Sequence, residues 1–174
     1  MSAGGNHERQ TTSPSGLAGQ TGKRRPFDHP EVELYLNLVR TAERLATQFD
    51  ALFREHGVSQ TQYNALRILQ GHGGPVPSGT VAREMVTREP DITRLLERLQ
   101  KLGYITRDRS EHDKRIMLAS LTDAGGALLE RLQGPVLDLH KGQFVHMSAA
   151  ELTDAIGVME RMREAAEDAG DEKM

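Results

Sequence analysis

The 174-residue chain contains no cysteine, and this absence excludes several kinds of chemistry. Without thiols the protein can form no disulfide, use no thiolate nucleophile and sense no oxidant through sulfur. Zinc fingers built on cysteine are excluded for the same reason. We therefore expect a cytoplasmic protein whose function does not depend on thiol chemistry.

Aromatic residues and long apolar runs are also scarce. Aromatic side chains make up 4% of the chain, tryptophan is absent, and hydrophobic residues reach only 37%, below the usual share for a globular protein. No run approaches the roughly 18 apolar residues of a membrane helix, and no charged-then-apolar signal segment is found. We expect neither a membrane span nor a signal segment.

Patterns for catalysis and metal binding are missing from the sequence. The seven histidines form no H-x-x-x-H pair and join no acidic cluster with metal-ligand spacing. There is no glycine-rich phosphate loop and no G-x-S-x-G elbow. We expect no enzyme activity, no metal and no cofactor.

The charge distribution singles out the middle of the chain. The net charge is -3, but residues 75–122 carry nine basic against seven acidic side chains. Residues 123–174 carry five basic against eleven acidic ones. This asymmetry fits one surface that faces DNA and another that faces away from it.

The N-terminal part contains a polar tail and a long helix. Residues 1–30 are rich in Gly, Ser, Thr, Gln and Pro, which predicts disorder. The basic cluster Lys23-Arg24-Arg25 in this tail is either solvated or an arm that touches phosphates. Residues 31–56 show apolar side chains at helical spacing, from Tyr35 to Phe53. This helix is long enough to serve both an intramolecular core and a dimer interface.

Residues 57–122 read as helices followed by a hairpin. The capping box Ser59 to Gln62 opens a second helix that ends before Gly71, and a short third helix is expected over Ser78 to Met85. A fourth helix should have Pro90 in its first turn, with Thr87 or Arg88 at or just before its cap. It ends at Gly103.

Two strands should follow the fourth helix, beginning at Tyr104 and covering Ile116 to Leu121, on either side of a charged tip. The order helix, turn, helix, hairpin predicts a mainly α winged helix-turn-helix with a small β-hairpin wing.

The C-terminal part should add two more helices, six in all. Thr122 caps the fifth, which Gly134-Pro135 must kink or break. Ser148 to Glu151 is a second capping box that opens the sixth. Residues 123–168 therefore form two helices, and 169–174 form a tail.

Four segments in the same order and spacing resemble the MarR family of bacterial transcription regulators. They are the helix Ile92 to Leu99, the turn Gly103-Tyr104-Ile105, the wing signature Asp113-Lys114-Arg115 and the helix start Leu121-Thr122-Asp123-Ala124-Gly125. Val58-Ser59 with Gln62-Tyr63 is also similar to the family's second-helix start. The resemblance covers about Glu31 to Met162.

The resemblance implies an obligate homodimer. Its dimerisation domain would comprise residues 31–56 and 123–168, and two winged lobes would read a pseudo-palindromic operator in double-stranded DNA. It also implies a pocket between the dimer helices and the lobe, for a small organic anion. By position, the candidate pocket residues are Tyr35, Leu38, Tyr63 and Arg67, with core packing as the alternative. Peroxide sensing through cysteine, known in one branch of the family, is excluded by composition.

In the wing, the resemblance implies that Arg115 enters the minor groove while Asp113 holds its guanidinium. A narrow A·T groove concentrates negative potential and favours arginine; the alternative is an ion pair within the hairpin. Arg109 and Lys114 are expected to contact phosphates, or else to be solvated charges at the tip.

On the fourth helix, the family's Thr-Arg pair falls on Thr93 and Arg94. Arg94 would reach a guanine or a phosphate, or else pair with Glu97 or Asp91. Arg88 and Thr93 are expected contacts at the helix N-terminus, where free amides favour phosphate.

The chain departs from the family at the start of this helix. Arg88-Glu89 and Asp91 stand where the family often has Ser-Arg and Thr. Carboxylates repel phosphates unless one accepts a hydrogen bond from a cytosine amino group, so Asp91 stays among the candidate contacts.

The predicted function is a sequence-specific DNA-binding transcription regulator, a homodimeric repressor that a small ligand releases from DNA. The alternative is a winged-helix dimer that binds proteins and has lost DNA binding through its acids at 89 and 91.

Overall fold

The computed structural model describes residues 16–22, 25 and 27–171, and the side chains as far as residue 166. Residues 1–15, Lys23 and Arg24 of the basic cluster, and residues 172–174 of the predicted C-terminal tail lie outside the described residues. The chain divides into two compact units, Met1–Gln48 and Phe49–Met174. Each unit is described by itself.

The first unit contains α1 (Gly16–Gln20) and most of α2 (Pro30–Glu55). The helix α1 lies within the segment 1–30 for which the sequence predicted disorder. The helix α2 begins one residue before the predicted start. Its apolar side chains in this unit stay largely in solvent, including Tyr35 with 65% of its surface exposed and Val39 with 50%.

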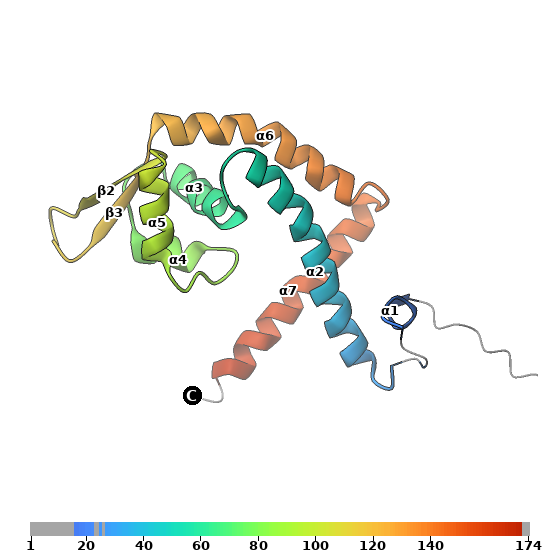
Figure 1. Cartoon of the computed structure of the whole chain (residues 1–174). Coiled ribbons are helices and arrows are strands. Elements are labelled where there is room, and N and C mark those ends of the chain that lie inside the picture. The colour runs from blue at the N-terminus through green and yellow to red at the C-terminus, as the bar shows by residue number, and fades with distance from the viewer. Residues whose placement is uncertain (1–15, 23–24, 26, 172–174) are drawn as a thin grey trace, which may run out of the picture. The chain divides into compact units, whose positions relative to one another are not determined.

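The second unit holds the helix-turn-helix and the wing (Figure 1). Its elements, in chain order, are α3 (Gln60–His72), β1 (Val76–Pro77), α4 (Ser78–Glu84), α5 (Ile92–Lys101), β2 (Ile105–Arg109), β3 (Met117–Leu121), α6 (Asp123–Gln143) and α7 (Ala149–Asp171). The three strands form an antiparallel sheet in the order β1-β3-β2. The mainly α fold with a hairpin wing is confirmed, and α1 brings the helices of the described chain to seven.

The strand β1 was not predicted. It pairs Val76 with Ala119 and Pro77 with Leu118 on β3. Two residues, one of them a proline, carry no period-2 pattern that could be recognised in the sequence. The short strand ties the α3–α4 connection to the wing and completes the sheet.

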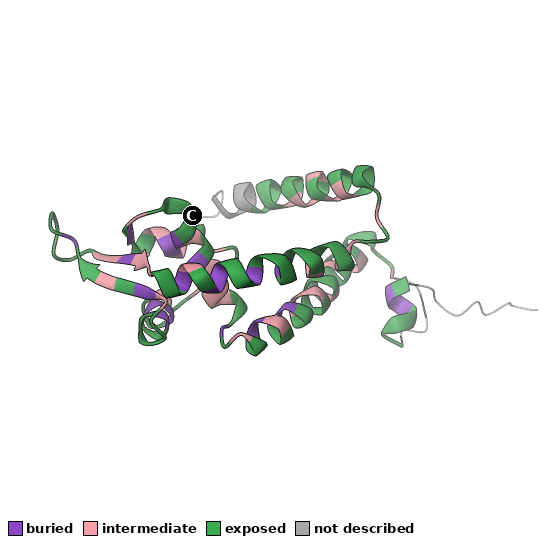
Figure 2. Cartoon of the chain, turned by 90° about the horizontal axis from the view of Figure 1, so that it is seen from above, coloured by how far each residue is buried: buried purple, intermediate pink, exposed green. Residues whose placement is uncertain are grey.

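The core of this unit lies where α3, α5, α6 and the sheet meet. Its largest fully buried side chains are apolar and come from these elements and from the end of α2: Phe53, Leu66, Leu69, Leu96, Leu99, Ile105, Leu128, Leu129 and Leu132. Figure 2 shows buried residues along α6 and none along the described part of α7. The winged lobe is thus a packed body, whereas none of the described side chains of α7, as far as residue 166, is buried in the single chain.

The junction between the wing and α6 depends on Thr122 and Gly125. The Thr122 hydroxyl donates to the Gly103 carbonyl at 2.7 Å and accepts from the Gly125 amide at 3.2 Å, so the predicted cap is confirmed. A Cβ on Gly125 would overlap the Tyr104 carbonyl oxygen and lie 2.8 Å from Leu121 Cδ1. Only glycine lets α6 pass this close to the backbone that leaves α5.

The sequence predicted a kink or break at Gly134-Pro135. The helix α6 is not interrupted there, since it runs from Asp123 to Gln143 with Pro135 inside it. Proline removes one backbone donor, but buried Leu132 and Val136 hold the helix on both sides of it. Figure 1 shows α6 changing direction along its course.

The second predicted capping box is confirmed. The Glu151 carboxylate accepts from the Ser148 amide at 2.8 Å, and the Glu151 amide donates to the Ser148 hydroxyl at 3.3 Å. The helix α7 therefore begins where its sequence predicts. Among the described helices, none is long and apolar enough to cross a membrane.

Candidate nucleic-acid interface

The start of α5 differs from its prediction. The N-cap is Asp91, whose carboxylate accepts the Arg94 amide at 3.0 Å, and the helix begins at Ile92. Pro90 lies in the preceding turn, so its placement in the first helical turn was wrong. The physical reason is that aspartate at this point satisfies a free helix amide, and its own backbone then stays non-helical.

Capping accounts for both carboxylates that depart from the family pattern. Glu89 Oε1 accepts the Asp91 amide at 3.2 Å, and Asp91 in turn caps the helix. Negative charge at this end also complements the helix dipole. These acids therefore have a structural role at the helix start that needs no base contact.

The outer face of α5 carries basic side chains. All eight predicted DNA contacts are exposed: Arg88, Asp91, Thr93, Arg94, Arg109, Asp113, Lys114 and Arg115. Ion pairs in the described chain join only His72 to Glu84 and Arg107 to Glu97. Arg94 therefore forms no ion pair with Glu97 or Asp91, which was the alternative to a DNA contact.

A shallow pocket of about 290 Å³ opens beside this face. One wall consists of Ser59, Thr61 and Gln62, at the capped start of α3. The other consists of Glu89, Asp91, Arg94, Leu95 and Arg98. The structure thus places the hydroxyls at the α3 start and two guanidinium groups of α5 around one pocket, together with the carboxylates of Glu89 and Asp91.

The tip of the wing is held by a small hydrogen-bond network. Asp113 Oδ1 accepts the backbone N–H of Arg115 at 2.9 Å. The described chain forms no ion pair between Asp113 and the Arg115 guanidinium, so the predicted grip of Asp113 on that guanidinium stays a prediction. The effect of the Asp113 carboxylate is to shape the turn from which the Arg115 side chain projects into solvent.

Ser110 is the part of this network that sequence reasoning missed. It is only 8% exposed, and its hydroxyl accepts from the amides of His112 and Asp113 at 3.3 and 3.4 Å. Its amide donates to the Ile116 carbonyl at 2.9 Å. The spacing of Ser110 and Asp113, a hydroxyl three residues before an acid, was the available signal.

The three basic side chains of the wing tip differ in whether they bind other atoms of the protein. Arg109 Nη1 donates to the Lys114 carbonyl at 2.6 Å, which ties the end of β2 to the opposite side of the tip. Lys114 and Arg115 have exposed side chains without a protein partner in the described chain. The guanidinium of Arg115 is thus free to enter a groove.

The predicted ligand-pocket residues divide between the two units. Tyr35 and Leu38 belong to the first unit. In the second unit, Tyr63 stacks on Phe53 with ring centroids 4.6 Å apart, and Arg67 Nη1 donates to Gln70 Oε1 at 2.9 Å. Tyr63 is therefore part of the packing around the core, and the four residues together remain a prediction.

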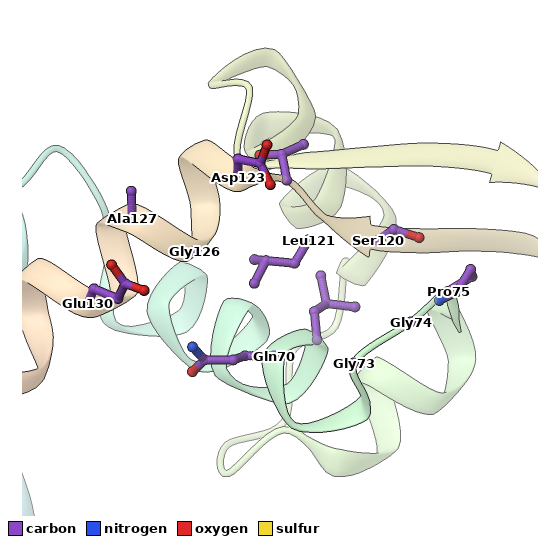
Figure 3. Close-up of a pocket in the computed structure, with 12 residues that line it drawn as sticks. Gln70, Gly73, Gly74, Pro75, Ser120, Leu121, Asp123, Gly126, Ala127 and Glu130 are labelled. Carbon is purple, nitrogen blue, oxygen red and sulfur yellow. The ribbon is translucent and has the colours of Figure 1, made fainter.

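A larger groove of about 480 Å³ lies elsewhere in the second unit (Figure 3). It runs between the Gly73-Gly74-Pro75 turn, the end of β3 and the first turns of α6. Asp123 and Glu130 stand on its α6 side. Two carboxylates make this groove unsuited to an organic anion, and it includes none of the predicted pocket residues.

A short helix, a turn and a second helix with an exposed basic face, followed by a charged hairpin, define the winged helix-turn-helix class. Comparison with known proteins identifies the family within it. Residues 56–116 match the model of the MarR family. The chain is 31% identical over 120 residues to the organic hydroperoxide resistance transcriptional regulator of Bacillus subtilis, which covers 66% of this chain and 81% of that protein. The chain belongs to the MarR family of transcription regulators.

Solved structures agree with this assignment. A MarR transcription factor from Planctomyces limnophilus is 37% identical, with a TM-score of 0.61 over 78% of this chain and 98% of that one. A cysteine-to-serine variant of MarR from E. coli, crystallised with operator DNA, is 20% identical and shares the fold with a TM-score of 0.64. That likeness covers 85% of this chain and 99% of the E. coli chain.

Proposed function

We propose that the protein is a homodimeric, sequence-specific DNA-binding repressor. One observation carries the proposal: α5 presents exposed arginines without ion-pair partners in the described chain, beside a wing whose ordered tip projects Lys114 and Arg115. A helix that reads the major groove and a hairpin beside it require this combination. Membership of a family of transcription regulators supports the same function.

The second part of the proposal is dimerisation through the helices outside the winged lobe. The apolar side chains that α2 and α7 leave in solvent include Tyr35 and Val39, and Ile156 with 59% of its surface exposed. Exposed apolar residues repeated along two long helices favour burial against a second copy. Two lobes held in this way would read a pseudo-palindromic site.

The third part is control by a small organic anion. The residues proposed for it are Tyr35, Leu38, Tyr63 and Arg67, since they offer aromatic and apolar surface with one cation. A ligand that binds better to a lobe spacing mismatched to the operator would weaken DNA binding. The effector would act without thiol chemistry, because the chain has no cysteine.

The test is fluorescence anisotropy with a labelled duplex from the region upstream of the protein's own gene, against a shuffled duplex of equal length. The proposal expects at least about a thousandfold preference for the upstream duplex at physiological salt. Equal, weak binding to both duplexes would favour the protein-interaction alternative. Light scattering on the same sample should give twice the 19.3 kDa mass of one chain.

A further inference from the structure

The side chain of Arg107 is mostly buried, although it lies in the charged hairpin. Its side chain is 9% exposed, and it shares a strand face with Ile105, which is 2% exposed. Its register partner on β3 is Ala119, which is fully buried. Arg109, two residues on, is exposed. Arg107 therefore cannot be one of the phosphate contacts of the wing.

The buried guanidinium reaches from the wing to α5. Its Nη1 lies 3.5 Å from Oε1 of Glu97, in the middle of that helix. Glu97 is separated in sequence by only one to three residues from the exposed Arg94 and Arg98. The pair thus joins the strand that carries the wing to the helix that carries the main DNA-facing cations.

Stability does not account for an arginine at this position. The ion pair is long, and the Glu97 side chain is 52% exposed, so the pair contributes little to stability. The Nε of Arg107 is buried without a hydrogen-bond partner among the described residues, which costs free energy. An apolar side chain of similar length would fill the same space at no loss. The arginine differs from such a side chain in its directional link to α5.

We propose that Arg107 is a positioning residue that fixes the angle between the wing and α5. The proposal rests on the proposed function, in which α5 and the wing occupy neighbouring grooves at the same time. When two contacts are linked rigidly at the correct separation, the second forms at a smaller entropic cost. Loss of the link would leave both contacts intact and reduce their cooperation.

The first test needs no DNA. Because the chain has no cysteine, Thr93→Cys and Glu111→Cys create a unique pair of label sites on α5 and the wing tip. Spin-label distances are measured after dilution with excess unlabelled chain, so that distances between copies do not contribute. Arg107→Met is expected to broaden the distance distribution, and Glu97→Ala to broaden it in the same direction. Lys101→Met is the control, since it removes an exposed cation of α5 that makes no side-chain hydrogen bond or ion pair in the described chain, and should leave the distribution unchanged.

The second test is a double-mutant cycle on the operator, with Arg107→Met and Arg115→Ala. In the parent chain, Arg107→Met is expected to weaken binding by up to about fivefold, the limit set by a weak ion pair, without changing the dependence on salt. In the Arg115→Ala background its effect should fall within about twofold, because the minor-groove contact that the link positions is absent. Arg109→Met should instead reduce the salt slope by about 1.

The results of the two tests separate the positioning role of Arg107 from misfolding and from failure of the proposed function. An unchanged distance distribution in Arg107→Met, or an equal loss of affinity in both backgrounds, would overturn the positioning role. A folded Arg107→Met variant, shown by an unchanged melting temperature, excludes simple misfolding. If the parent chain shows no preference for any duplex while the distribution still broadens, the proposed function fails and the mechanical link stands.

Discussion

Asp113 Oδ1 accepts the backbone N–H of Arg115 at 2.9 Å. An acid is thereby built into the wing tip, on the surface that we propose meets a polyanion. Its carboxylate shapes the turn together with the buried Ser110 hydroxyl, which accepts from the Asp113 amide at 3.4 Å. The main-chain geometry of the tip therefore depends on a charge that, by itself, repels phosphates.

This relationship makes the effect of Asp113→Ala opposite to what charge alone predicts. Removing a negative charge near DNA should strengthen binding, whereas losing the turn should weaken it. We expect about a tenfold loss of affinity, measured by anisotropy on the operator. Glu111→Ala removes an exposed acid of the same tip that makes no side-chain hydrogen bond in the described chain, and should leave affinity unchanged or slightly higher. Stronger binding by both variants would refute a structural role for Asp113.

The cap on α5 can be separated from any role of its charge. Asp91→Ala removes the acceptor for the Arg94 amide and should lower the free energy of unfolding by about 1 kcal/mol. Asp91→Asn keeps a good cap and should remain close to the parent chain. Urea denaturation of the two variants measures both values. Equal losses in the two would mean that the carboxylate charge, not the cap, is what matters at this position.

The fold and site were predictable from the sequence where their chemistry is local. The capping boxes at Ser59 and Ser148 and the Thr122 cap depend on residues three apart, and all three formed as expected. The start of α5 was misplaced because proline and aspartate stood side by side as competing start signals. The family resemblance predicted a contact between Asp113 and Arg115. It could not show that the Asp113 carboxylate accepts from the backbone N–H of Arg115.

Tertiary relationships could not be read from the sequence in the same way. The pairing of Val76 with Ala119 joins residues 43 apart across a two-residue strand. The link from Arg107 to Glu97 depends on how the sheet packs against α5, although period-2 alternation after Ile105 already placed Arg107 on a buried face. A charged residue on an otherwise apolar strand face was the signal in the sequence for the link from Arg107 to Glu97.

Gly125 is the glycine that the junction between the wing and α6 requires. A Cβ at this position would meet the backbone oxygen of Tyr104, which cannot move without shifting the end of α5. Gly125→Ala should therefore destabilise the protein by about 1–3 kcal/mol. Gly126→Ala is the matched control, since a Cβ there meets nothing within 4 Å and should stabilise the helix by about 0.5–1 kcal/mol. Thermal melts that give the two variants the same sign would contradict this packing.

The capping box at the start of α7 should make stability depend on pH. The backbone hydrogen bond from Ser148 lowers the pKa of Glu151 below its ordinary value of 4.5, and the Ser148 hydroxyl and nearby His146 act in the same direction. Because the pKa is lower in the folded state, the stabilisation is present above the unfolded-state value. It is lost as the pH falls through the folded-state value.

Comparison of Glu151→Gln with the parent chain tests this dependence. The parent should melt at the higher temperature at pH 7, and the difference should shrink once the pH falls below about 4.5. Glu160→Gln, at an exposed position on the same helix, controls for loss of a negative charge. A difference in melting temperature that stays constant from pH 7 to pH 3 would exclude the proposed cause.

The central claim is that two winged lobes hold a two-fold site, with α5 in the major groove and Arg115 in the adjacent minor groove. Hydroxyl-radical footprinting of the parent chain and Arg115→Ala on the upstream duplex tests it most directly. We predict protections related by a dyad, with the two half-sites about one helical turn apart, roughly 10 base pairs or a multiple of it. Arg115→Ala should lose the flanking minor-groove protections and keep the rest. A footprint without two-fold symmetry, or one that Arg115→Ala leaves unchanged, would contradict the account.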